Sequence, residues 1–152
     1  MSIWKPHVTV AAIIEKEGRF LLVEEDTPEG VLLNQPAGHL EPGESLLAAV
    51  RRETLEESAW HFEPKHLVGI YQWRPPAHDL TYLRFSFAGA LLGHEPSRTL
   101  DTGILGTHWL TAEEIALSRA RHRSPLVYDC VRDYLSGVRY PLALLHHYST
   151  EG

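Results

Sequence analysis

The stretch from Gly38 to Trp60 constrains this chain most, because it predicts one amphipathic helix that ends in a cluster of acidic side chains. Pro42-Gly43 is typical of a turn, and Glu44-Ser45 offers an acidic, capping start to a helix. From there to Ser58 no Pro or Gly interrupts the sequence, and Leu, Ala, Arg and Glu, all good helix formers, dominate it. The stretch therefore predicts a helix that ends near Ser58.

Three carboxylates of this helix, Glu53, Glu56 and Glu57, share one face because they are spaced i, i+3 and i+4. The repulsion among the three carboxylates and their interaction with the helix dipole each destabilise the helix. Each effect is worth roughly a few tenths of a kcal/mol when the side chains are exposed. A bound divalent cation reverses the sign of both effects. Oxygen-only ligands favour Mg²⁺, or Mn²⁺, over zinc. The alternative is a solvated acidic face without an ion.

The whole stretch resembles the Nudix box, a pattern of Gly, five residues, Glu, seven residues, Arg-Glu, an aliphatic residue, any residue, and Glu-Glu, which is followed by any residue and Gly. The positions that match are Gly38, Glu44, Arg52, Glu53, Glu56 and Glu57. Thr54 stands where an aliphatic residue is usual, and Ala59 where Gly is usual. If that position needs a positive φ, Ala costs about 1 kcal/mol there, and a helix that runs one residue longer would avoid this cost.

The resemblance implies roles for the box residues. Glu53, Glu56 and Glu57 would hold the metal and act in catalysis. Arg52 would keep these carboxylates in position with support from Glu44, although a weak surface ion pair is the alternative. The carbonyl of Gly38 would join the metal shell, unless Gly38 is a plain loop residue. The general base is not assigned.

The order of the other elements, together with the resemblance, predicts an α/β/α sandwich with a mixed, curved sheet. Strands are expected at residues 7–15, 19–25, 31–33, 67–74, 80–92 and 107–110, with residues 60–65 as a connector. A helix with a capping box is expected from Thr111, and a last helix from Ser124-Pro125 to Gly137.

Four residues outside the box are candidates for substrate contacts, two of them as alternatives for one role. Arg84 lies on the polar side of its strand, where it would grip a phosphate or simply face solvent. Trp73, or Tyr71, would stack on a pyrimidine or purine face, or else pack in the core. Arg123 would add positive charge near a phosphate at the start of the last helix. The histidines show no zinc spacing, and a structural hydrogen-bonding role is expected of the two in matched segments, at positions 7 and 39.

Size and charge bound the class of protein. The 152 residues fit one domain, residues 1–152, and the net charge of −6 argues against nucleic acid as a partner. Cys130 is the only cysteine, so no internal disulfide indicates an oxidising compartment, and we expect it to be a core residue. No apolar run approaches the roughly 18 residues of a membrane span. We expect a cytoplasmic protein, as a monomer or small homo-oligomer, that acts on a small-molecule pyrophosphate.

The resemblance covers nearly the whole chain and is strongest to bacterial phosphatases of the family. It implies a Mg²⁺-dependent hydrolase that releases phosphate from nucleoside di- and triphosphates. It also implies cleavage of thiamine pyrophosphate or its hydroxymethylpyrimidine pyrophosphate precursor. The alternatives are another Nudix activity, on ADP-ribose or an oxidised nucleotide, and a non-catalytic module that senses nucleotides.

Overall fold

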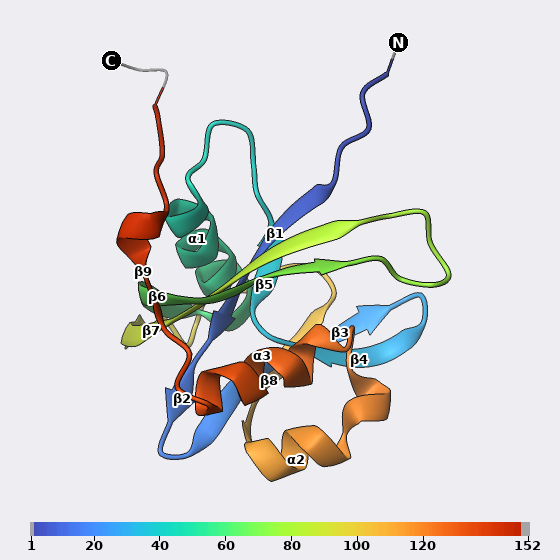
Figure 1. Ribbon diagram of the computed structural model, residues 1–152. Coiled ribbons are helices and arrows are strands. Elements are labelled where there is room, and N and C mark those ends of the chain that lie inside the picture. The colour runs from blue at the N-terminus through green and yellow to red at the C-terminus, as the bar shows by residue number, and fades with distance from the viewer. Residues whose placement is uncertain (1, 150–152) are drawn as a thin grey trace.

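The computed structural model describes residues 2–149, whose strands form two sheets (Figure 1). The first sheet has the order β5 (Ala37–His39), β1 (His7–Ile13), β7 (Tyr82–His94), β6 (Trp60–Trp73) and β9 (Tyr140–Pro141). It is mixed, because β1 and β7 are parallel while its other pairs are antiparallel. The second sheet is antiparallel and contains β2 (Glu15–Lys16), β3 (Arg19–Thr27), β4 (Gly30–Asn34) and β8 (Ile104–Thr111).

Two helices cover opposite faces of the first sheet. Ala49 and Val50 of α1 (Leu46–Ser58) pack in one core cluster with Val10, whereas Val127 of α3 (Leu126–Leu135) packs in another cluster with Ile13. Because alternate side chains of a strand point to opposite faces, the two clusters lie on the two sides of the sheet. The remaining helical segments are α2 (Ala112–Leu117), η1 (Arg119–Arg121) and η2 (Leu142–Leu144). The predicted fold class is therefore confirmed.

Several local predictions are confirmed, at the first residues of two helices and in the core. The Oγ of Ser45 accepts a hydrogen bond from the Ala48 N–H at the start of α1. Thr111 and Glu114 form the expected capping box of α2. Cys130 is fully buried, as expected. Among the described residues, no helix has both the length and the apolar character needed to cross a membrane.

The two departures from the box pattern have different physical outcomes. Thr54 is fully buried, and its hydroxyl donates a 2.7 Å hydrogen bond to the Val50 carbonyl, so its polar atom is satisfied where an aliphatic residue is usual. Ala59 has φ 63°, in the left-handed region, and its N–H donates to the Leu55 carbonyl as it ends α1. The expectation that the helix runs one residue longer is therefore wrong.

One prediction about the strands was wrong, and one short strand of the first sheet next to the box was missed. Residues 60–65 are not a connector but the first part of β6, which pairs with β7 through three register irregularities around Phe62, Pro64 and Val68. Such bulges let a strand pass a proline that cannot donate to the ladder. β5 was not predicted, because its three residues are too few to show a period of two.

Candidate active site

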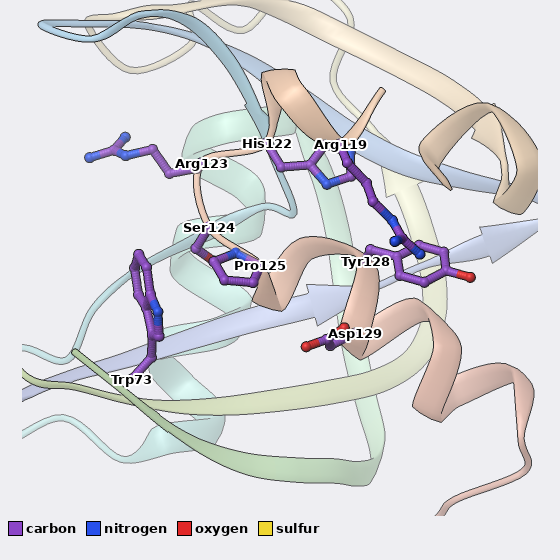
Figure 2. Close-up of a pocket in the computed structure, with 8 residues that line it drawn as sticks. All are labelled: Trp73, Arg119, His122, Arg123, Ser124, Pro125, Tyr128 and Asp129. Atoms are coloured by element: carbon purple, nitrogen blue, oxygen red, sulfur yellow. The ribbon is translucent and has the colours of Figure 1, made fainter. Parts of the chain in front are cut away.

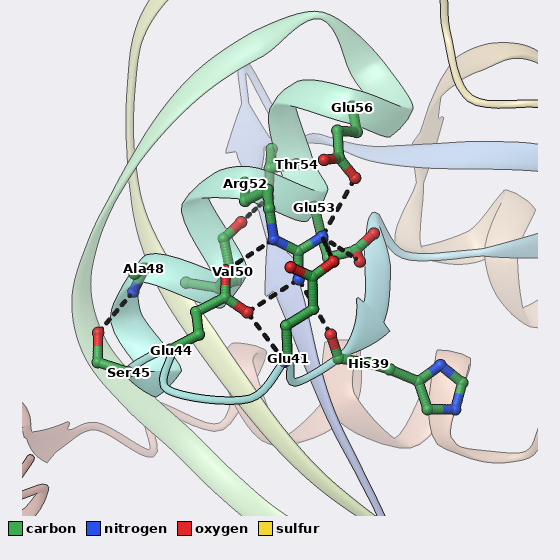
Figure 3. Close-up of polar contacts among 10 residues, drawn as sticks. All are labelled: His39, Glu41, Glu44, Ser45, Ala48, Val50, Arg52, Glu53, Thr54 and Glu56. Carbon is green, nitrogen blue, oxygen red and sulfur yellow. Dashed lines mark hydrogen bonds and ion pairs between the residues drawn. The ribbon is translucent and has the colours of Figure 1, made fainter. Parts of the chain in front are cut away.

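Arg52 lies at the centre of the box and binds four groups at once (Figure 3). Its guanidinium donates hydrogen bonds to Glu44 (2.7 Å), Glu53 (2.7 Å) and Glu56 (3.2 Å). It also donates to the His39 carbonyl at 3.0 Å. The hydrogen bond and charge of Glu44 raise the pKa of Arg52, and Arg52 in turn lowers the pKa of Glu44. Since a guanidinium offers five N–H donors in a fixed plane, this contact set fixes how the carboxylates are oriented.

Gly38 is in close contact with Glu53. A Cβ added at Gly38 would lie 2.1 Å from the Cδ atom of Glu53, a separation that real Cβ atoms do not show. A side chain at this position would therefore displace the Glu53 carboxylate from the place it occupies beside β5. Burial raises the pKa of Glu53, and the hydrogen bond and charge of Arg52 offset part of that effect.

Glu57 lies deeper than the other acidic residues of the box. Its Oε1 accepts a 2.9 Å hydrogen bond from the Ala37 N–H. Burial raises its pKa to about 8, and the negative charges of Glu25 and Glu53 add to the shift. Glu25, a buried residue of β3, is therefore an acidic neighbour of the site that the spacing within α1 did not reveal.

Asp101 was also missed by the sequence reasoning. Carboxylate oxygens of Glu53, Glu56 and Asp101 lie within 4.8 Å of one another. Asp101 precedes β8, and its N–H donates a 3.0 Å hydrogen bond to the Glu56 carbonyl. That bond joins segments far apart in sequence, so the spacing within the helix gave no signal of it.

These residues fit a hard divalent cation. The three side chains of this group, Glu53, Glu56 and Asp101, supply carboxylate oxygens, which Mg²⁺ and Mn²⁺ prefer as ligands. The absence of a Cβ at Gly38 leaves the space that the Glu53 carboxylate occupies. The predicted ligands Glu53 and Glu56 are brought together with Asp101, while Glu57 lies beside them on the Ala37 side.

Arg84 does not face solvent. Its side chain is buried on β7 and donates hydrogen bonds to Asn34 Oδ1 (2.8 Å) and Gln35 Oε1 (3.0 Å). Gln35 in turn donates to the Val127 carbonyl of α3. Of the two alternatives for Arg84, the one in which it faces solvent is therefore excluded. In the part of the chain that the structure describes, no carboxylate lies within ion-pair distance of Arg84.

Arg123 and Trp73 line the same pocket, which has a volume of about 390 Å³ (Figure 2). Arg123 forms an ion pair with Glu25, and its N–H donates a 2.8 Å hydrogen bond to the Leu33 carbonyl. Through Glu25, Arg123 is linked to the surroundings of Glu57. The Trp73 ring is half-buried. The other residues that line the pocket are Arg119, His122, Ser124, Pro125, Tyr128 and Asp129.

Tyr71 has a structural environment instead. Its hydroxyl donates a 2.8 Å hydrogen bond to Asp133 of α3, and burial raises its pKa. Its side chain packs against the core cluster beneath α3. Trp73 is therefore the better placed of the two candidates for stacking, because it lines an open pocket.

Comparisons with known proteins place the chain among proteins of one family. The model of the NUDIX domain matches residues 5–130. The chain is 46% identical over 143 residues to phosphatase NudJ of Escherichia coli K12. The aligned region covers 93% of this chain and 92% of the relative. A NUDIX hydrolase from Nitrosomonas europaea superposes with a TM-score of 0.93 at 50% identity, over 97% of this chain and 100% of that one.

A more distant structure, a MutT NUDIX hydrolase from Burkholderia pseudomallei, shares the fold with a TM-score of 0.73 at 20% identity, over 86% of this chain and 98% of that one. The match of the domain model covers most of the sequence, and the phosphatase relative matches along nearly its whole length. The chain belongs to the Nudix hydrolase family.

Proposed function

We propose that this Nudix hydrolase is a Mg²⁺-dependent phosphatase, for which Mn²⁺ would substitute. Its substrates would be nucleoside di- and triphosphates, from which it releases phosphate, together with thiamine pyrophosphate or its hydroxymethylpyrimidine pyrophosphate precursor. The similarity to phosphatase NudJ supports phosphatase activity, and the substrates proposed are those that the sequence resemblance implies. The observation that supports metal dependence is the group of oxygens from Glu53, Glu56 and Asp101, which Arg52 helps to orient.

The roles of the box residues follow from their contacts. Glu53, Glu56 and Glu57 would hold the cation, with the Gly38 carbonyl and Asp101 as further oxygen ligands. A bound cation supplies charge shielding for the phosphates and lowers the pKa of a water molecule. Arg52 would act by positioning, because it holds Glu53 and Glu56 through one oxygen each and leaves the remaining oxygens free.

Two arginines outside the box would bind the phosphates. The side-chain partners of Arg84, the Asn34 and Gln35 amides and the Cys130 thiol, carry no carboxylate, so a phosphate would supply the negative charge that this buried guanidinium lacks. Arg123 already forms an ion pair with Glu25, but its side chain is only partly buried. It therefore remains accessible at the pocket. Together they offset the acidic character of the site toward an anionic substrate.

A substrate panel tests the proposal. The purified protein is assayed with Mg²⁺, with Mn²⁺ and with EDTA on nucleoside triphosphates, thiamine pyrophosphate, its pyrimidine precursor and ADP-ribose, and the products are identified as phosphate, pyrophosphate or monophosphate. We expect metal-dependent release of phosphate from the nucleotides. Cleavage of ADP-ribose alone would replace this substrate assignment, and nucleotide binding without turnover would favour a sensor.

A further inference from the structure

Four rings lie side by side across four neighbouring strands of the first sheet. Trp73 on β6 stacks on Tyr82 of β7, with ring centroids 6.1 Å apart and planes at 22°. Tyr82 is 5.7 Å from His7 of β1, and His7 is 5.7 Å from His39 of β5. We call these four side chains the ring row. The two histidines, expected to have a hydrogen-bonding role, make ring contacts instead.

The ring row lies on the face of the sheet that α3 covers. Trp73 and His7 are both directly paired with Tyr82, so the three side chains share one face. Arg84 is two residues along β7 from Tyr82 and therefore points to the same side. Since Arg84 contacts Cys130 of α3, the row lies on the α3 side, next to the segment that leads into this helix.

The two ends of the row meet the two parts of the candidate active site. At one end, His39 follows Gly38, and its carbonyl accepts a hydrogen bond from Arg52. At the other end, Trp73 lines the pocket with Ser124 and Pro125 (Figure 2). Arg123 lines this pocket as well. The row therefore runs from β5, the strand that borders the box, to the pocket that Trp73 and Arg123 line.

The length of the row sets which substrates reach its far end. Three interstrand spacings separate β5 from β6, which is about 14 Å at about 4.8 Å per spacing. In a one-ring pyrimidine pyrophosphate, the ring is joined to the first phosphate through a single methylene group and an oxygen. In a nucleoside triphosphate, a sugar and further phosphates lie between the base and the terminal phosphate.

We propose that the ring row is the binding track for the heterocycle of the substrate, and that Trp73 is a specificity residue that only longer substrates contact. With the reacting phosphate at the box, the base of a nucleoside triphosphate reaches Trp73, while a one-ring pyrimidine pyrophosphate stays over His7 and His39. This inference rests on the proposed function, because it places the reacting phosphate at the carboxylates. Stacking tolerates every base, since each has a π-face, so the track selects length rather than base identity.

The test compares three probes of decreasing length, ATP, hydroxymethylpyrimidine pyrophosphate and tripolyphosphate, in the presence of Mg²⁺. KM is measured for probes that are hydrolysed, and an inhibition constant for those that are not. Trp73→Leu keeps an apolar side chain and removes the ring, and Trp73→Phe restores a ring. Tyr140→Leu is the matched control, because Tyr140 is an exposed ring of the same sheet outside the row.

We expect Trp73→Leu to raise the KM for ATP about tenfold, as the loss of one stacked base predicts, with kcat unchanged. The same change should leave the constants for the two shorter probes within about twofold, because these probes do not reach Trp73. Trp73→Phe should recover most of the ATP affinity, and Tyr140→Leu should alter none of the constants. An equal effect of Trp73→Leu on all three probes, or no effect on ATP, would overturn the proposal. A wild-type protein that hydrolyses no pyrophosphate with any divalent cation would instead overturn the proposed function.

Discussion

The backbone N–H of Ala37 donates a 2.9 Å hydrogen bond to Oε1 of Glu57, and so joins the segment before the box to the last turn of α1. The bond satisfies one oxygen of a carboxylate that is otherwise poorly solvated, and whose pKa burial raises to about 8. At neutral pH without metal, Glu57 therefore holds a proton. A cation that binds beside it favours the ionised form, so metal binding and proton release are coupled at this residue.

The first prediction concerns Glu57→Gln in the presence of EDTA. The folded pKa of about 8 lies above the unfolded value of 4.5, so the folded state binds more protons between these pH values, and stability falls as pH rises through that window. Gln cannot ionise, so the variant does not lose stability in this way as the pH rises. The two pKa values differ by about 3.5 (8 − 4.5), and one pKa unit is worth about 1.4 kcal/mol, so we expect the variant to be more stable than the wild type at pH 8 by roughly 4 kcal/mol. Urea unfolding at pH 5 and pH 8 measures the difference.

The same variant should lose metal-dependent hydrolysis, because Gln offers a neutral oxygen in place of a carboxylate. Glu113→Gln, on exposed α2, is the matched control and should change neither stability nor activity. If Glu57→Gln is no more stable at pH 8 than at pH 5 relative to the wild type, the carboxyl group is not held protonated.

The box could be predicted from the sequence because its geometry is local. The helical spacing of Glu53, Glu56 and Glu57 follows from 3.6 residues per turn, and the chain segment that forms it is continuous. Asp101 and Glu25 could not be predicted in this way. Each reaches the site through pairing of distant strands, Glu25 by its place in β3 and Asp101 through the segment that precedes β8. The pairing register between strands that are far apart in sequence depends on how the whole core packs. The spacing of residues within one short segment does not reveal it.

The second prediction concerns Arg52→Ala. The change leaves Glu44 and Glu53 without their shared cation and releases the orientation of the carboxylates. Residues that orient metal ligands typically contribute about 10–100-fold to activity or metal affinity, and we expect a loss of that size in kcat/KM. Arg52→Lys should recover only part of it, because an ammonium group cannot reproduce the planar fork.

Arg51→Ala is the matched control for Arg52, because Arg51 is the preceding residue of the same helix and pairs with Glu63 at the exposed surface. Its activity should remain within about twofold of the wild type, since exposed ion pairs contribute little. Metal titration of both variants separates the two roles. An Arg52→Ala protein that is less stable but binds metal and turns over normally would show that Arg52 only supports the fold.

The third prediction tests whether Arg84 binds a phosphate, by giving it a permanent anionic partner. Asn34→Asp places a carboxylate where the amide oxygen now accepts a 2.8 Å hydrogen bond from Arg84. We expect a rise in KM of about tenfold, because the loss of one charge-assisted contact is worth about 1.4 kcal/mol or more. Thermal stability should be retained, since the buried cation gains a partner. Gln72→Glu, the same change of charge at an exposed position of β6, is the control.

Arg84 also shows why the alternation of polar and apolar residues along a strand did not predict which polar side chains are buried. The alternation of Tyr82, Arg84 and Ser86 correctly placed them on one face of β7, yet Ser86 and Arg84 are buried beneath α3. A polar face usually indicates solvent, but here the polar atoms are satisfied by Cys130 and by the amides that precede the box. Whether a second layer covers a face depends on where a helix at the other end of the chain packs.

The last prediction concerns the residue that ends α1. Ala59 adopts φ 63°, a conformation that costs an L-residue about 1 kcal/mol relative to glycine, although its methyl group is buried. We expect Ala59→Gly to raise the stability by about 0.5–1 kcal/mol and the Tm by about 2–4 °C, after the loss of methyl burial. Turnover should stay within a few fold, because Ala59 supplies no ligand. Ala48→Gly, in the same helix at negative φ, should instead lower the Tm, since glycine there only adds freedom to the unfolded chain. The opposite signs of the two substitutions, measured by thermal unfolding, identify the strain at Ala59, and a lower Tm for both would show that the buried methyl group outweighs it.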